Sequence, residues 1–454
     1  MNSKFPLLVR PGLALAICCA GLLAPGLCAA TEWSAKPSVS VNLQHDSNLL
    51  LTTASHQGVT ALTVAPRIDL SAQQENWNVS GSAELRGHRY WGESGLNGND
   101  QIFNLSSLYR TQRSTWQLGG GYAKESVTAS TAFSPDIGLV GTQTQRITRS
   151  VNPSWLFQMT QRTQIELSYQ SSLVSYQNGP NTYLSDYDAS DGAAALLYQW
   201  SPRDQLSAEV DRSYFKVPQS GLSQLGQPAF SPLSGGLFIL QPNPQQLSNT
   251  SNTDNLVLGW THAFSQTLNG NIGFGARQTT SDSVVQTCTA GTPTSIIIIG
   301  GQPVGIGPCT QTADTVFSEK SSGYLYNAGL TKQFTLTHVA LSLSRQVNPS
   351  AIGSQVLTDS ATLAINHTLS QRLSAGLSLS SYRIQAISST TPGTVKWNYI
   401  LASTDLIWHW TRQLKVQGGY RYLRVGFPNS SLQASDNAIY LNLSYAWQGA
   451  SISR

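Results

Sequence analysis

The chain has 454 residues, and its 27 Lys or Arg and 23 Asp or Glu make up only 11% of them. A soluble domain usually carries about a quarter charged residues, so an ordinary soluble surface is missing. A helical membrane protein is also excluded, because a spanning helix needs ~20 consecutive apolar residues and the longest aliphatic run beyond residue 30 is Ile296–Ile299. The 11 Trp, 17 Tyr and 12 Phe argue against disorder.

The first 30 residues have the pattern of a secretory signal peptide. Lys4 and Arg10 form a basic start, an apolar stretch follows over 12–27, and small residues at 28–30 form a cleavage site. We therefore predict a signal peptide over 1–30 and one exported domain over 31–454. Loss of the two basic residues lowers the net charge from +4 to +2, so no nucleic-acid partner is expected.

From residue 37 onward the side chains alternate between apolar and polar instead of following a helical period. Over 439–447 every second residue is Ile, Leu, Tyr or Trp, with small or polar residues between them. The segments 77–86 and 373–380 repeat this pattern. A period of two over about ten residues is typical of a β-strand with one apolar and one polar face. The pattern predicts an all-β protein.

Two kinds of connection alternate between the predicted strands. The short ones lie at 73–76, 111–114, 160–163, 201–204, 265–268, 335–337, 370–373 and 411–414. The longer ones are rich in Gly, Pro and Asn and include 129–141, 177–186, 218–249, 286–313 and 428–436. This alternation is typical of a transmembrane antiparallel up-and-down β-barrel with short periplasmic turns and long extracellular loops. Eight short turns predict about 18 strands, within a range of 16–20 set by the strands beside the two longest loops.

The tryptophans support a membrane barrel. Seven of the 11 lie within about five residues of a short turn, where such a barrel places its aromatic girdle. They are Trp77, Trp116, Trp155, Trp200, Trp260, Trp408 and Trp410. We therefore predict a location in the cell outer membrane, with membrane lipid and the barrel-assembly machinery as partners.

The face opposite the large apolar residues is expected to line the lumen, and it carries charges of both signs. The candidate lumen-lining residues are Glu84, Arg86, His88, Arg110, Glu166, Glu209, Asp211, Arg277, Asp405, His409, Lys415 and Arg421. Two interpretations stay open: ion pairs that brace the wall, or a constriction that selects solutes by size and electric field. The mixed signs predict weak ion selectivity, and the many Ser, Gly, Asn and Gln on this face predict an open, polar interior. The loop 218–249 either folds into the lumen or stands outside.

Catalytic and metal-binding motifs are absent from the sequence. It contains no GxSxG, HExxH or P-loop, and no CxxC or Cys/His cluster. The adjacent residues His45, Asp46, Ser47 and Asn48 alternate in direction on a strand, so Asx-type turn residues explain them better than a catalytic triad. We therefore predict no enzyme, no metal and no cofactor.

Cys288 and Cys309 are the two cysteines that remain after removal of the signal peptide. An even pair in an exported protein predicts one disulfide, and the alternative is two free thiols on a loop. The chain-entropy model assigns ~3 kcal/mol to closing such a loop.

The segment 39–51, which contains Asp46 and Asn48, resembles the first strand of the β-barrel porin superfamily. Members of that family often begin with an aromatic residue, Asp, any residue, Asn and two apolar residues. The architecture resembles this family over 37–448, and within it the chain is most similar to outer-membrane proteins associated with exopolysaccharide and exosortase (PEP-CTERM) gene clusters. The resemblance implies a channel or an export-associated barrel that serves extracellular polysaccharide or surface-protein systems.

Three other functions stay open at this point. The first is a general solute-diffusion porin, whose ligands are small polar solutes. The second is a non-conducting structural or adhesive barrel. An outer-membrane enzyme is the least favoured, because no catalytic motif supports it.

Overall fold

The computed structural model describes residues 31–453, except 93, 128–143, 178–183, 221–228, 233–237, 242–246, 292–294, 300–301, 307–308, 352, 388–395 and 427–431. Within 219–247 and 285–313, and at residue 396, only the backbone of the strands is described. The predicted signal peptide over 1–30 lies outside the described residues. Among the residues that are described, no helix is long and apolar enough to cross a membrane.

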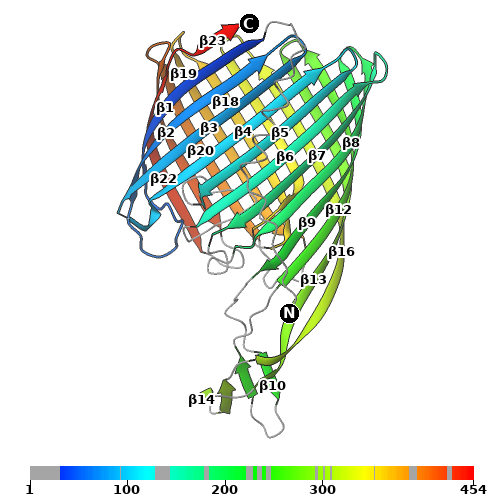
Figure 1. Ribbon diagram of the computed structural model, residues 1–454, viewed down its shortest axis with the longest axis vertical. Coiled ribbons are helices and arrows are strands. Elements are labelled where there is room, and N and C mark those ends of the chain that lie inside the picture. The colour runs from blue at the N-terminus through cyan, green and yellow to red at the C-terminus, as the bar shows by residue number, and fades with distance from the viewer. Residues whose placement is uncertain are drawn as a thin grey trace, which may run out of the picture.

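Nineteen antiparallel strands form one sheet, and eighteen of them close into a barrel (Figure 1). The barrel strands are β1 (Glu32–Asp46), β2 (Val59–Gln73), β3 (Trp77–Trp91), β4 (Gly98–Arg110), β5 (Ser114–Ser126), β6 (Gln145–Gln158), β7 (Thr163–Tyr176), β8 (Tyr187–Ser201), β9 (Asp204–Ser220), β12 (Leu247–Ser265), β13 (Leu268–Gly291), β16 (Cys309–Gln333), β17 (Thr337–Pro349), β18 (Gln355–Thr368), β19 (Leu373–Ala386), β20 (Lys396–His409), β21 (Leu414–Gly426) and β22 (Gln433–Ala446). The nineteenth, β23 (Ala450–Ser453), pairs with the beginning of β1. Because β1 pairs with both β2 and β22, the sheet closes on itself. The prediction of an all-β barrel of about 18 strands is confirmed.

The eight predicted short turns all connect consecutive barrel strands, and they lie together at the top of Figure 1. Their similar sequences have a local cause. At four of them the hydroxyl oxygen of the first residue accepts the backbone N–H three residues later, at 2.9–3.1 Å. These residues are Thr111, Thr160, Ser370 and Thr411. A Ser or Thr at the first position therefore satisfies a turn N–H that the strands cannot.

The period of two separates each strand into an outward and an inward face. On β3, Leu85 points outward and is 51% exposed, whereas its neighbours Glu84 and Arg86 point inward and contact each other. Near the short turns the outer face carries stacked indoles. The ring centroids of Trp116 and Trp155 are 5.2 Å apart, as are those of Trp408 and Trp410.

Near the opposite end three apolar clusters are buried inside the barrel, among buried polar groups such as Ser251, Thr253 and Thr279. One cluster consists of Val127, Val174, Tyr176, Leu184, Tyr187, Phe215, Val217 and Ala351. A second consists of Leu51, Val356, Ile384, Tyr399, Leu423, Val425 and Ala434, and a third of Leu49, Val59, Ala61, Tyr90 and Leu96. The predicted polar interior is therefore only partly right at this end, because connecting segments fold inward and bury these apolar side chains, which stabilises each large one by ~1.5–3 kcal/mol.

The two longest predicted loops contain strands. β10 (Ala229–Pro232) and β11 (Phe238–Gln241) lie between β9 and β12, and β14 (Ser295–Ile299) and β15 (Gln302–Ile306) lie between β13 and β16. These four form a separate sheet below the barrel in Figure 1, so the described strands of 218–249 stand outside the lumen. The predicted loop 286–313 is also wrong at both ends, because β13 and β16 run through 286–291 and 309–313.

Candidate functional site

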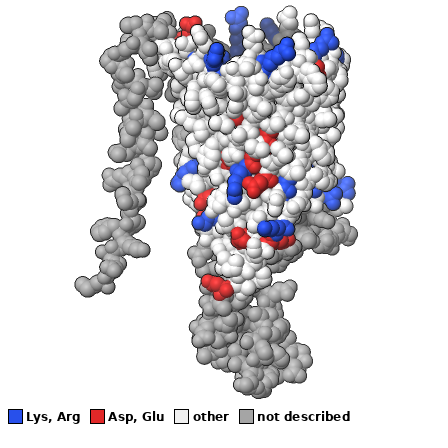
Figure 2. All heavy atoms as spheres, turned by 90° about the vertical axis from the view of Figure 1, so that its right-hand side faces the viewer, with Lys and Arg blue, Asp and Glu red and all other residues white. Residues whose placement is uncertain are grey.

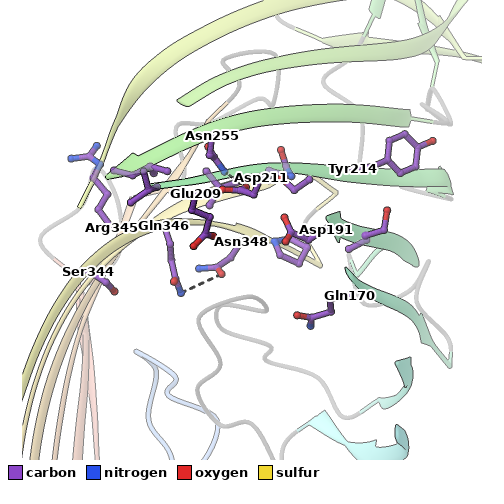
Figure 3. A pocket seen from close by; sticks show the side chains of 18 of the residues that line it. Gln170, Asp191, Glu209, Asp211, Tyr214, Asn255, Ser344, Arg345, Gln346 and Asn348 are labelled. Atoms are coloured by element: carbon purple, nitrogen blue, oxygen red, sulfur yellow. Dashed lines mark hydrogen bonds between the residues drawn. The ribbon is translucent and has the colours of Figure 1, made fainter. Parts of the chain in front are cut away.

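A cavity of about 460 Å³ lies inside the barrel, between β7, β8, β9 and β12 on one side and β16 and β17 on the other. Figure 3 shows the polar side chains that border it. Asp191, Glu209, Asp211 and Asn255 come from one side, and Gln346 and Asn348 from β17. The two amides are joined by a 3.5 Å hydrogen bond in which Gln346 Nε2 donates to Asn348 Oδ1.

Four carboxylates face inward on adjacent strands, and we call them the acidic wall: Glu166 on β7, Asp191 on β8, and Glu209 and Asp211 on β9. In the strand register Ala195 lies between Glu166 and Glu209, so a small side chain separates them. Asn255 Nδ2 donates a 2.6 Å hydrogen bond to Asp211 Oδ1. Within the described part of the chain, none of the four forms an ion pair with Lys or Arg. Asp191, Glu209 and Asp211 therefore present negative charge to the cavity. The one Lys or Arg in the lining, Arg345, forms its ion pair with Asp359 and not with the acidic wall.

Inward charges on β2, β3 and β5 are paired instead. Glu84 lies between Arg67, at 3.1 Å, and Arg86, which also reaches Glu125 at 3.4 Å. On the same strand as Glu84, His88 Nε2 lies 2.8 Å from the buried carboxylate of Asp100. The positions of Glu84, Arg86 and His88 match the interpretation of bracing contacts along the wall.

The seam between the first and last strands contains a second polar cluster. Arg421 of β21 reaches Asp46 at 2.8 Å and Asp436 at 3.5 Å. Asp436 Oδ1 also accepts the backbone N–H of Asn48 at 2.8 Å, and Asn48 Oδ1 accepts the N–H of Thr52 at 3.0 Å. The motif residues Asp46 and Asn48 therefore hold the seam and an Asx-type turn, and they contact a candidate lumen residue that is distant in sequence.

The other candidate residues are spread along the inward face. Arg277 is buried opposite Asn255 and donates to Thr279 Oγ1 at 2.9 Å. Asp405 lies over Gly376, where a Cβ would come within 2.5 Å of its Oδ1. Arg110 is at the short-turn end of β4, and His409 and Lys415 face each other at the short-turn end of β20 and β21. The structure therefore does not bring the twelve candidates to one site.

A short segment between β17 and β18 folds into the barrel, and we call residues 350–355 the inner segment, of which 352 is outside the described residues. The backbone oxygen of Ala351 accepts the N–H of Ser185 at 2.7 Å, and Gly353 O accepts from Asn249 Nδ2 at 2.9 Å. Gln355 Oε1 accepts from the hydroxyls of Ser251 and Thr253, both at 2.9 Å. Because Pro349 and Gln355 line the cavity, the inner segment borders it.

Several residues of the site were missed by the sequence reasoning. Asp191 has the same parity as Ala193 and Ala195, opposite the outward Leu196 and Tyr198, so the alternation alone could have placed it in the lumen. Gln346 and Asn348 alternate with outward residues in the same way. The inner segment had a weaker signal, the Pro and Gly of 349–353.

Cys288 and Cys309 lie on neighbouring strands. The register pairs Cys288 of β13 with Thr312, and Cys309 of β16 with Gly291, so the two are not directly opposite. Their side chains lie outside the described residues. The disulfide stays a prediction.

Comparison with known proteins gives likenesses in the solved structures alone. No family model and no curated protein matches the chain. A closed form of the ferric-catecholate import receptor Fiu from Escherichia coli K12 is similar with a TM-score of 0.46 and 9% identity, over 91% of this chain and 81% of that one. OccAB2 from Acinetobacter baumannii has a TM-score of 0.44 and 9% identity, over 91% and 98%. OpdK from Pseudomonas aeruginosa, solved with vanillate, has a TM-score of 0.43 and 9% identity, over 92% and 99%.

Proposed function

We propose that the protein is an outer-membrane channel for small polar solutes that prefers cations. The observation that carries this proposal is the cavity inside the barrel, bordered by Asp191, Glu209 and Asp211 without an ion-pair partner among the described residues. A carboxylate in a confined site of low dielectric attracts cations more strongly than one in bulk water. Export through the predicted signal peptide and insertion by the barrel-assembly machinery belong to the same proposal.

The outer face supports a membrane location. From the short turns to about mid-strand, the outward positions carry Leu, Val, Ile, Ala, Phe and Trp with almost no charge. An apolar band flanked by aromatic residues is the surface that a transmembrane barrel presents to lipid. A soluble barrel would gain nothing from exposing it.

Reversal potentials in planar bilayers under a salt gradient test the channel and its selectivity. The native protein is expected to conduct and to prefer cations. Replacing three carboxylates together (D191N, E209Q and D211N) should move the reversal potential towards the anion-selective side. D254N is the matched control, because Asp254 is an acid at a similar height that points outward and is 61% exposed. A correctly folded barrel that never conducts would contradict the channel, and equal shifts in both variants would contradict the acidic wall.

A link to extracellular polysaccharide is the second candidate, and the amides around the cavity favour it. Gln346, Asn348 and Asn255 offer donors and acceptors that suit sugar hydroxyls. Block of the single-channel current by neutral oligosaccharides, reduced by N348A, would support this role. If no oligosaccharide tried affects the current, the polysaccharide role is contradicted and only the solute channel remains.

A further inference from the structure

Outward-facing basic residues gather at one level of the barrel, where the apolar outer band ends. Each lies roughly 9–12 residues from the short-turn end of its strand. A rise of ~3.3 Å per residue and a strand tilt of ~40° convert this to a height of ~25 Å, which is the height of a barrel's apolar band. Figure 2 shows basic and acidic side chains together in this layer, below a wide and mostly white zone.

Six of these residues form what we call the basic belt: Arg89, Lys124, Arg149, Lys216, Arg383 and Arg424. Each has the same parity as an exposed apolar residue of its own strand, for example Leu85 beside Arg89 and Leu379 beside Arg383. None of the six forms an ion pair with a described residue, although Asp188 is the register partner of Lys216. At the same level Arg212 and Arg345 do have acidic partners, Asp254 and Asp359.

The arrangement is densest on β5 and β6. Lys124 pairs with Ile147 in the register, which makes Arg149 its diagonal neighbour, and Arg149 pairs with Tyr122. Diagonal neighbours on one face lie ~7–8 Å apart, within reach of long side chains. Two cations and a phenol hydroxyl can therefore contact one phosphate group together.

From this placement we propose that the basic belt binds the phosphorylated headgroups of lipids in the outer leaflet. The cations stand where hydrocarbon gives way to headgroups, and most lack a partner in the protein, so an anionic lipid is the group that would neutralise them. The proposal rests on the membrane location given above, but it does not depend on conduction through the lumen.

Lipid titration of the folded barrel in detergent, followed by tryptophan fluorescence, tests the belt. The probes are diphosphorylated lipid A, the same lipid without its phosphates, and inorganic phosphate. The double variant K124Q/R149Q is expected to bind the phosphorylated lipid about tenfold more weakly than the native barrel does. R162Q/R412Q is the matched control, because it removes two positive charges on the short turns at the other rim and should change little.

The outcomes separate the sources of binding. Equal affinity for lipid with and without phosphate, or equal weakening in both double variants, would overturn the proposal. Displacement of the lipid by inorganic phosphate at low concentration would also overturn it, since it would indicate a site for small anions. Gel mobility of unheated samples shows that each variant is folded. Unchanged conductance of K124Q/R149Q keeps this test independent of the channel.

Discussion

Arg421 stands between two buried carboxylates, and this contact joins the first strand to the last ones. The side chains of Asp46 and Asp436 are 1% and 3% exposed, whereas that of Arg421 is 29% exposed. A buried carboxylate without its cation carries a large desolvation cost. The seam therefore depends on one guanidinium that contacts two acids.

Substituting Arg421 with Met should destabilise the barrel by ~3 kcal/mol, the low end for breaking a buried pair because Arg421 is partly solvated. Urea unfolding of the protein refolded in lipid vesicles measures this loss. R67M is the control, since Arg67 pairs with Asp69 and Glu84 but is 41% exposed, and a loss below ~1 kcal/mol is expected there. Equal losses in the two variants would show that burial does not set the strength of the seam.

The alternation in the sequence was sufficient to place individual residues on a face, but not to group them. It placed Glu209 and Asp211 on the inward face. It could not show whether they have ion-pair partners, because alternation does not tell which residues of β8 and β12 lie at the same height. Arg421 shows the same limit, because its partner Asp46 is 375 positions away. Contacts across the seam follow from closure of the sheet, which no local pattern describes.

At the scale of the strand, the outward and inward faces have different tolerance for charge. On β19, Leu377 points outward between Ile365 and Thr404, and Ser378 points inward between Ala364 and Ser403. Their backbones are adjacent and equally hydrogen-bonded in the sheet. A difference in stability between the same substitution at Leu377 and at Ser378 therefore reports the surroundings of the side chain alone.

L377R is expected to destabilise the barrel by ~2–4 kcal/mol, whereas S378R should be tolerated, because the first charge enters lipid and the second an aqueous lumen. Folding yield in vesicles and the urea midpoint give the comparison. Equal effects would mean that the face assignment or the membrane location is wrong.

The short turns were predictable, and the inward-folding connections were not. Six of the eight short turns begin with a Ser or Thr whose side chain bonds the backbone of the same turn, so their sequence specifies their structure. The inner segment is held by Asn249, Ser185 and the hydroxyls of β12, which lie far away in sequence. Its direction is set by tertiary contacts, and Pro and Gly alone indicate only that a connection exists.

Releasing the inner segment should raise the mean single-channel conductance and its fluctuations. The double variant N249A/Q355A removes three hydrogen bonds that hold it beside the cavity. Q164A is the control, because Gln164 is an inward residue near the short turns whose amide bonds Gln158 at 3.0 Å. Conductance traces that match the native protein would show that the inner segment does not limit the current.

For the whole molecule, two surfaces of opposite character follow from one alternating pattern. The outward face is apolar from the short turns to the basic belt, and the inward face is polar but gains three apolar clusters towards the other end. The barrel therefore has a polar cavity bordered towards that end by apolar clusters and buried polar groups. The alternation and the spacing of the turns predicted the barrel and its polar face, but the apolar clusters require Leu51 and Ala351 to reach the interior from connections.

Joining β1 to β22 makes folding a nearly all-or-none event. The seam hydrogen bonds cannot form until every intervening strand is in place, so their free energy is gained last, and such long-range topology slows folding. A chain stalled before that step has two open sheet edges, each able to template pairing with another chain. Whatever shields those edges during insertion controls how many chains reach the native state. A truncation that removes β22 and β23 should therefore leave aggregates and no smaller barrel.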